Sequence, residues 1–280
     1  MSALTSCLRA LGLHATADGL DDTVARATKE RWSTTQILEH LVAMEERERA
    51  RRSLERRLGR SRLGRFKPIA DFDWAWPSQI DRPRVESALR LDFVEPARNI
   101  VLVANQGLGK TTIAQNIAHN AILEGHTALF VTASQMLLDL GSQDSARALD
   151  RRLRYYCGVN LLVIDEVGYL AFDNRNADLL FQVVSRRYEK KPIVLTTNLA
   201  FSDWPSVFPN ATCAIALIDR IVHHADVLVI AGKSYRLREA QNDSPPATAM
   251  GNVTVTSTTL QKTPSPKSRK PPKPSSSQLP

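Results

Sequence analysis

The sequence lacks the features of membrane, secreted and metal-cluster proteins. No apolar run approaches the roughly 20 residues that span a bilayer, and charged residues interrupt the N-terminal stretch where a signal peptide is apolar. The three cysteines, Cys7, Cys157 and Cys213, lie far apart and at no metal-ligand spacing. We therefore expect a cytoplasmic protein with reduced thiols and no membrane partner.

Excess charge is also missing from most of the chain. The net charge of +8 arises outside residues 68–240, whose 18 basic and 19 acidic groups nearly cancel. Residues 47–67 carry ten basic and two acidic groups, and residues 241–280 carry five and one. Such a short, strongly basic segment is typical of a surface that binds a polyanion.

The C-terminal residues 241–280 are rich in Ser, Thr, Pro and Lys and poor in apolar side chains. This composition predicts a disordered tail. Two interpretations of the tail stay open: a solvated segment without a function, or a weak nucleic-acid contact. The basic residues that would make such a contact are Lys262, Lys267, Arg269, Lys270 and Lys273.

The spacing of apolar residues predicts a long helix from Thr34 to about Leu58, followed by alternating strands and helices. Strands are expected at 100–104, 128–132, 161–165, 193–197 and 227–231, and helices at 84–91, 110–123, 145–157, 176–188 and 216–224. This alternation predicts an α/β fold with a five-stranded parallel sheet flanked by helices. Few residues separate the last strand from the tail, so a helical lid is expected to be reduced or absent.

A glycine-containing loop follows the first of these strands and ends in Gly109-Lys110-Thr111 at the start of a helix. This is the setting of a Walker A loop, in which backbone N–H groups face phosphates, the lysine adds positive charge and the threonine binds Mg²⁺. Ala104 stands where a first glycine is usual, and its methyl group is expected to fit at the end of the strand. The expected nucleotide-binding residues are Gly107, Leu108, Gly109, Lys110, Thr111 and Thr112.

A second motif consists of four apolar residues, 161–164, followed by Asp165 and Glu166. Such a run is common in ordinary sheets, but here Asp165 follows Lys110 by 55 residues, which favours a Walker B strand. Asp165 is expected to hold Mg²⁺ together with Thr111. Glu166 is expected to take a proton from the attacking water.

Two further polar positions follow predicted elements. Asn198 comes directly after a strand, where ligands of parallel sheets collect, so we expect it to orient water and sense the γ-phosphate; the alternative is that Thr197 or Asn198 only caps a turn. Arg220 is expected to reach the nucleotide of a neighbouring subunit; the alternative is a surface pair with Asp219. The histidine pair at 223–224 has no acid at ligand spacing and is interpreted as structural.

The basic segment 47–67 is expected to bind double-stranded DNA. Arg47, Arg51 and Arg52 are expected near one face of the helix, with Arg56 one turn further on, as a stripe along a phosphate backbone. No aromatic residue is interleaved, so little base readout is expected. The alternative is a solvated charged helix face. The expected DNA-binding residues are Arg47, Arg51, Arg52, Arg56, Arg57, Arg60, Arg62, Arg65 and Lys67.

Together these motifs resemble the IstB-like helper ATPases of bacterial insertion sequences, relatives of the DnaC helicase loaders within the AAA+ group. The matching stretches are 107–111, 162–170, 197–204 and 219–224, with 234–238 resembling the family's C-terminal end and 66–67 and 71–74 its N-terminal part. The resemblance covers about residues 30–240 and implies an AAA+ P-loop NTPase. The tail and Asn105-Gln106, where the family commonly has prolines, depart from the pattern.

The resemblance implies an ATPase that binds ATP and Mg²⁺, self-associates on DNA as an oligomer and stimulates a partner transposase. It also implies that Arg220 is the trans-acting finger and suggests Arg236 as a nucleotide sensor. The domains expected on this basis are a helical DNA-binding region (1–67), a connector (68–97), the AAA+ ATPase domain (98–240) and the disordered tail (241–280).

Two alternatives stay open from the sequence. A DnaC-like loader of a replicative helicase would carry the same ATPase motifs. A DNA-binding scaffold with little turnover would result if Ala104, Asn105 and Gln106 weaken the nucleotide site.

Overall fold

A five-stranded parallel sheet forms the centre of the molecule, with the strand order β2-β3-β4-β1-β5. The computed structural model describes residues 3–169, 171–209, 211–236 and 238. The strands are β1 (Asn99–Ala104), β2 (Ala128–Thr132), β3 (Leu161–Val167), β4 (Ile193–Thr197) and β5 (Ala225–Ile230). All five lie where the apolar runs predict them, because their side chains are mostly buried on both faces of the sheet.

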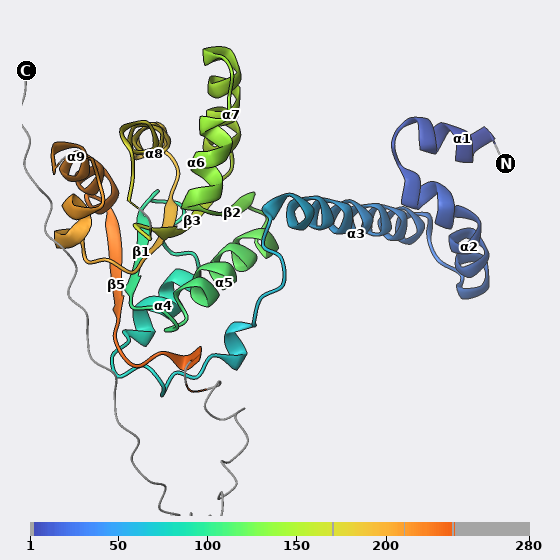
Figure 1. The fold of residues 1–280 in the computed structure, drawn as a ribbon. Coiled ribbons are helices and arrows are strands. Elements are labelled where there is room, and N and C mark those ends of the chain that lie inside the picture. Colours follow the sequence, from blue (N-terminus) through green and yellow to red (C-terminus); the bar gives the residue numbers. More distant parts are fainter. Residues whose placement is uncertain (1–2, 170, 210, 237, 239–280) are drawn as a thin grey trace, which may run out of the picture. The chain divides into compact units, whose positions relative to one another are not determined.

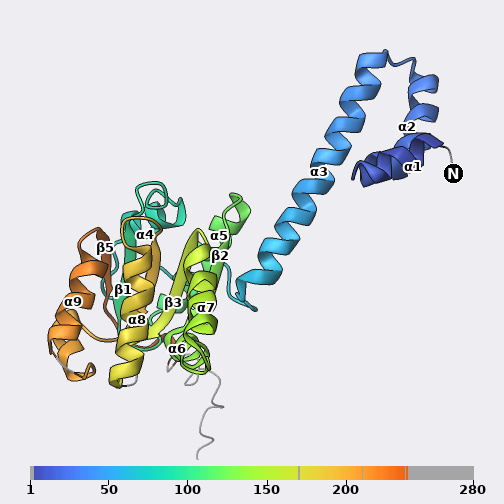
Figure 2. The same ribbon diagram turned by 90° about the horizontal axis from the view of Figure 1, so that it is seen from above.

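Helices cover both faces of this sheet (Figures 1 and 2). One face packs against α4 (Arg82–Leu89) and α5 (Lys110–Leu123). The other packs against α6 (Ala133–Gly141), α7 (Ala146–Gly158), α8 (Asn174–Arg187) and α9 (Ala211–Val222). The predicted α/β class and the five-stranded parallel sheet are confirmed.

Helix α6 is absent from the prediction for a local reason. Thr132 is both the last residue of β2 and the N-cap of α6, and its side chain accepts a hydrogen bond from the backbone N–H of Gln135. No turn residues separate the strand from the helix, so the usual sequence signal of a loop is missing. Two short 3₁₀ helices, Ile69–Asp71 and Phe201–Ser206, complete the connections.

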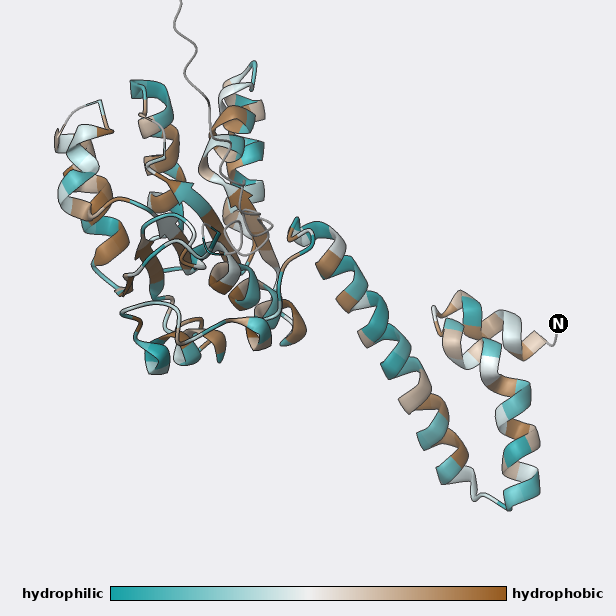
Figure 3. Ribbon diagram, turned by 60° about the horizontal axis from the view of Figure 1, so that its bottom comes forward, coloured by the Kyte–Doolittle hydropathy of each residue, from teal (hydrophilic) through white to brown (hydrophobic). Residues whose placement is uncertain are grey.

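Three helices precede the sheet: α1 (Ala3–Ala10), α2 (His14–Glu30) and α3 (Thr34–Ser61). The Ser33 side chain accepts from the backbone N–H of Gln36 while the Gln36 side chain accepts from the backbone N–H of Ser33, a reciprocal cap that fixes the start of α3. The buried Glu45 of α3 accepts a hydrogen bond from the backbone N–H of Thr16 at 3.1 Å, which ties α2 to α3. The hydrophilic colour of much of α3 contrasts with the apolar strands (Figure 3).

The C-terminal part of α3 joins the sheet domain through α5. The guanidinium of Arg57 donates from Nε to the carbonyl oxygen of Ile122 at 3.2 Å, in the last turn of α5. Buried Leu63 and half-buried Leu54 pack into the core on the α5 side of the sheet. The amide of Asn116, also in α5, holds the chain that follows α3 by bonding Lys67 O and Ile69 N, each at 2.9 Å.

No helix within the described residues is long and apolar enough to cross a membrane. The predicted disordered tail, 241–280, lies outside the described residues. Of the residues between β5 and this tail, 231–236 and 238 are described, and a reduced or absent lid stays a prediction.

Candidate nucleotide-binding site

The loop between β1 and α5 depends on two glycines with left-handed backbone. Gly107 has φ 75° and Gly109 has φ 85°, values at which residues with a Cβ are strained. A Cβ on Gly107 would lie 2.1 Å from Ser234 Oγ, and one on Gly109 would lie 2.4 Å from Phe72 Cε2. The loop is therefore packed from two sides, and the predicted turn into the helix N-terminus at Lys110 is present. Ala104 ends β1 and is buried, so its methyl group fits as expected.

Lys110 is held by its own loop. Its Nζ donates to the carbonyl oxygens of Ala104 at 2.6 Å and Asn105 at 2.8 Å. Burial lowers the pKa of Lys110, an effect that the carboxylate of Asp165 opposes and the guanidinium of Arg236 reinforces. The ammonium is thus fixed beside the glycine loop, where a phosphate would compete for it with two neutral carbonyls.

Thr111 and the end of β3 meet at the carboxyl edge of the sheet. The hydroxyl of Thr111 lies 3.2 Å and 3.1 Å from the two carboxylate oxygens of Asp165. Thr196 of β4 donates a short hydrogen bond to the same carboxylate from its hydroxyl. Asp165 is only 3% exposed, and the two hydroxyls fix the position and orientation of its carboxylate.

Glu166 stands in an unusual backbone conformation. Its φ is 61°, and the pairing of β3 with β4 shifts register between Ile164 and Val167. The backbone N–H of Glu166 donates to Thr196 Oγ1 at 2.9 Å. A register shift of this kind redirects a side chain, and here the otherwise buried strand presents one exposed carboxylate to the cavity.

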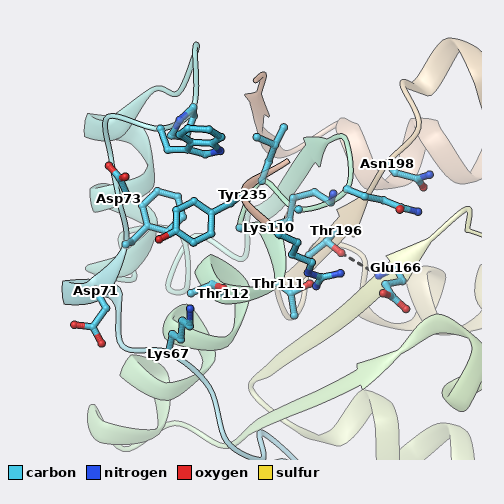
Figure 4. A pocket seen from close by; sticks show the side chains of 18 of the residues that line it. Lys67, Asp71, Asp73, Lys110, Thr111, Thr112, Glu166, Thr196, Asn198 and Tyr235 are labelled. Carbon is cyan, nitrogen blue, oxygen red and sulfur yellow. Dashed lines mark hydrogen bonds between the residues drawn. The ribbon is translucent and has the colours of Figure 1, made fainter. Parts of the chain in front are cut away.

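Lys110, Thr111, Glu166 and Thr196 line one cavity of about 430 Å³, while the buried Asp165 lies behind it and bonds the Thr111 and Thr196 hydroxyls. Figure 4 shows Lys110, Thr111 and Glu166 on one side of it and Asp71 and Asp73 on the other. The remaining predicted residues on its wall are Gly107, Leu108, Gly109, Thr112 and Asn198. Asn198 therefore lies at the cavity, while Thr197 caps the following turn by accepting from Leu199 N at 3.1 Å.

The opposite wall was missed from the sequence, except for Arg236, which the family resemblance suggests as a nucleotide sensor. It consists of connector residues and of the chain after β5, namely Lys67, Pro68, Asp71, Phe72, Asp73, Trp76, Pro77, Tyr235 and Arg236. The two segments are joined where Trp76 Nε1 donates to Lys233 O at 2.8 Å and Tyr235 N donates to Gly107 O at 2.9 Å. For the connector part of this wall, the only signal in the sequence is the cluster of aromatic residues in that short segment.

The residues present fit a nucleoside triphosphate with Mg²⁺. Gly107 and Gly109 line the cavity with backbone that carries no Cβ, and the ammonium of Lys110 lies beside their loop. The Asp165 carboxylate and the Thr111 hydroxyl offer the hard oxygen ligands that Mg²⁺ prefers. The aromatic connector provides an apolar wall of the kind that a base requires.

A family model described as IstB-like ATP binding protein matches residues 6–243. The chain belongs to this family. A relative from Geobacillus stearothermophilus, whose name links it to ATP binding and insertion sequence IS5376, is 36% identical over 207 residues, covering 74% of this chain and 82% of the relative. A relative from Pseudomonas aeruginosa, named likewise for insertion sequence IS21, is 34% identical over 220 residues, with coverages of 79% and 83%.

Two solved structures share the fold of this IstB-like protein. The crystal structure of DnaI has a TM-score of 0.51 and 19% identity, and the match covers 60% of this chain and 92% of DnaI. The AMPPCP-bound DnaA from Aquifex aeolicus has a TM-score of 0.50 and 17% identity, with coverages of 65% and 56%. At these identities the likeness shows the fold alone.

Arg220 does not line the cavity of its own chain. It lies in the last turn of α9, and its guanidinium sits 4.5 Å from the ring centroid of Phe181 in α8. Arg236, in contrast, lies on the cavity wall of this IstB-like chain. The predicted role of Arg220 therefore requires a second subunit and stays a prediction.

The observed extent of helix α3 determines which arginines share one face. At roughly 100° per residue, positions i, i+3, i+7 and i+11 share one face. Arg49, Arg52, Arg56 and Arg60 have this spacing and are all exposed. Arg47 falls on the opposite side of the helix from Arg56, so the expected stripe that joins these two residues is wrong.

Several of the predicted DNA-binding residues have other contacts. Arg51 and Arg52 pair with Glu48 within α3. Arg57 bonds α5, and Arg62 lies 5.8 Å from the ring centroid of Tyr155. Lys67 lines the nucleotide cavity instead of extending the helix face, because the chain has left α3 by then. DNA binding by the set as a whole stays a prediction.

Proposed function

We propose that this IstB-like protein is an ATP-hydrolysing helper of transposition. It assembles as an oligomer on double-stranded DNA and stimulates a partner transposase, and hydrolysis controls the assembly. The observation that carries the proposal is the convergence of Lys110, the Thr111–Asp165 pair and the redirected Glu166 on one cavity. The names of the relatives, which refer to insertion sequences, support transposition over helicase loading.

The loop and its lysine bind the phosphates. Backbone N–H groups at the start of α5 and the ammonium of Lys110 offer positive charge to them. A Mg²⁺ ion bound by Thr111 and Asp165 would neutralise charge that develops on the phosphate oxygens. Phe72 and Trp76 exclude water from the side of the cavity that receives the base.

Glu166 and Asn198 act on the water. The exposed carboxylate of Glu166 accepts a proton from the water that attacks the γ-phosphate, while Asn198 orients that water from the end of β4. Arg220 of a neighbouring subunit supplies the positive charge that stabilises the transition state. Because the finger comes from another copy, assembly and hydrolysis are linked.

DNA contact belongs to the exposed face of α3 formed by Arg49, Arg52, Arg56 and Arg60. Four guanidinium groups along one face match a phosphate backbone, and no aromatic group among them can read a base. We therefore assign this face to duplex DNA of any sequence.

The test is ATP turnover with and without duplex DNA. We expect hydrolysis that DNA stimulates, and in Glu166→Gln a turnover lower by about 10²–10⁴-fold with ATP binding retained. The matched control is Glu124→Gln, an exposed acid at the end of α5, which should keep wild-type turnover. Near-zero turnover of the wild type under both conditions, with DNA binding intact, would favour a scaffold instead.

A further inference from the structure

A cluster of two histidines and one carboxylate lies at the amino edge of the sheet, away from the glycine loop. Glu189 precedes β4, and His223 and His224 precede β5, whereas the glycine loop follows β1. In a parallel sheet the amino and carboxyl ends of the strands form opposite edges. Ligand atoms from these three side chains all lie within 4.8 Å of one another.

We propose that Glu189, His223 and His224 form a binding site for a divalent transition-metal ion of the zinc class. Two imidazoles and one carboxylate suit Zn²⁺ and its neighbours, while Mg²⁺ and Ca²⁺ prefer oxygen ligands alone. Three protein ligands leave a fourth position for water. The sequence does not point to Glu189 as a partner of the histidine pair, because Glu189 is 35 residues from His224 and only the fold brings them together.

The ligands are already close and oriented. His224 Nε2 lies 3.1 Å from Glu189 Oε1. The Tyr188 hydroxyl lies 2.7 Å from Nδ1 of His223, and the two rings stack with centroids 6.1 Å apart. A hydrogen bond that fixes the imidazole ring is a regular partner of metal-binding histidines. About half of the His224 and Glu189 side-chain surface is exposed, so an ion can reach both from solvent.

Hydrogen bonds from Asn99 hold the backbone that carries the histidines. Asn99, a buried residue at the start of β1, donates from its side chain to Ile221 O at 2.9 Å and accepts from Ile193 N at 2.9 Å. Its backbone N–H donates to His224 O at 2.7 Å. One side chain thus links the end of α9 with the start of β4, so the two ligand-bearing turns keep a constant separation.

Hydrogen bonds also hold the backbone beside Glu189. Arg187, at the end of α8, is 1% exposed and donates to Val159 O at 2.9 Å and Pro192 O at 2.7 Å. Glu189 has φ 54°, a left-handed conformation that costs energy for a residue with a Cβ. The last-turn carbonyls of α9 add a partial negative charge near His223, which favours a cation there.

The test measures zinc binding by isothermal titration calorimetry. It uses the full chain, without an affinity tag and without nucleotide. The wild type should bind one Zn²⁺ equivalent that a large excess of Mg²⁺ does not displace. His224→Gln and Glu189→Gln should each weaken binding at least about 10-fold, and Tyr188→Phe about 10-fold, the size found for lost ligand-orienting bonds. Cobalt(II) should give visible absorption bands that the His224→Gln variant lacks.

Two matched controls separate this site from others. His14→Gln removes an exposed histidine at the start of α2, and Cys7→Ser removes the exposed thiol; both should bind zinc as the wild type does. Circular dichroism of each variant checks that it is folded. Zinc binding that is absent from the wild type, that Mg²⁺ displaces, or that survives in both His224→Gln and Glu189→Gln would overturn the proposal.

Discussion

Strand β3 and helix α3 use charged residues in opposite ways. In β3 every residue except Glu166 is buried, and the charge of Asp165 is fixed by hydroxyls from α5 and β4. In α3, a helix of 28 residues, only Glu45 and Ser61 are buried. Most of its arginines lie in solvent, and Arg49, Arg51 and Arg52 pair with acids one turn away.

The difference predicts how each region responds to change. A charge in a buried, fixed position interacts strongly with its neighbours, so one substitution has a large effect. Exposed ion pairs are screened and contribute about 0–1 kcal/mol each. A single substitution in β3 should therefore have a large effect on function. In α3 the effect should grow with the number of charges removed.

The largest effect is expected from the proposed finger between subunits. Arg220→Ala should lower ATP turnover by about 10³–10⁵-fold, whereas Arg154→Ala, at an exposed position of α7, should not. A mixture of Arg220→Ala with Lys110→Ala should regain activity, because Lys110→Ala subunits supply the finger to intact loops. A mixture that co-assembles and stays inactive would remove Arg220 from this role.

Arg187 extends the contrast to a cation that is buried in the protein interior. Burial lowers the pKa of Arg187 to about 10, yet it remains charged at neutral pH and bonds five backbone carbonyls, four within residues 156–160 and the fifth at Pro192. Arg187→Met should leave these carbonyls unsatisfied and lower the free energy of unfolding by at least about 3 kcal/mol, measured by urea denaturation. The adjacent Arg186→Met, which loses only the exposed Asp150 pair, should cost below about 1 kcal/mol. Equal losses would contradict the contrast between buried and exposed charge.

The arginine face of α3 should act additively. Changing Arg49, Arg52, Arg56 and Arg60 together to Gln should reduce the slope of log affinity for duplex DNA against log salt by up to about 3.6, or ~0.9 per phosphate contact. Each single change should reduce the slope by at most ~0.9. Arg47→Gln, on the opposite side, is the matched control. A single residue that accounts for most of the loss would refute the additive picture.

The smallest effect concerns pH. Hydrogen bonds from Arg51 and Arg52 lower the pKa of Glu48 from 4.5 to about 2. Because the folded pKa is depressed, the stabilising effect of Glu48 is complete above pH 4.5 and is lost as the pH falls toward 2. The difference in urea midpoint between the wild type and Glu48→Gln should shrink over this range. Glu46→Gln, which changes a neighbouring exposed acid and leaves both arginine bonds to Glu48 in place, is the matched control.

The sheet and the glycine loop that begins α5 were predictable because their signals are local. Apolar runs mark buried strands, and Lys110 and Thr111 are placed by a loop only a few residues long. Asp165 and Asn198 follow from the rule that strand ends meet at one edge of a parallel sheet.

What the sequence did not reveal depends on contacts between distant residues. Trp76 bonds Lys233 across 157 positions, and Glu189 meets the histidine pair only after α8 and α9 have packed. The stripe expected on α3 is wrong for a simpler reason. At roughly 100° of rotation per residue, Arg47 and Arg56 lie on opposite sides of the helix. The backbone conformation of Glu166 likewise arises from a register shift that no local residue signals.

The left-handed backbone at Glu166 sets the requirements of folding against those of the proposed turnover at one residue. A side chain at positive φ costs about 1–2 kcal/mol, against a net folding stability of about 5–15 kcal/mol for typical proteins. Glycine would relieve this strain, although its greater freedom in the unfolded chain would offset part of the gain. The same change would remove the carboxylate from the cavity. At this position, folding and the proposed turnover favour different amino acids.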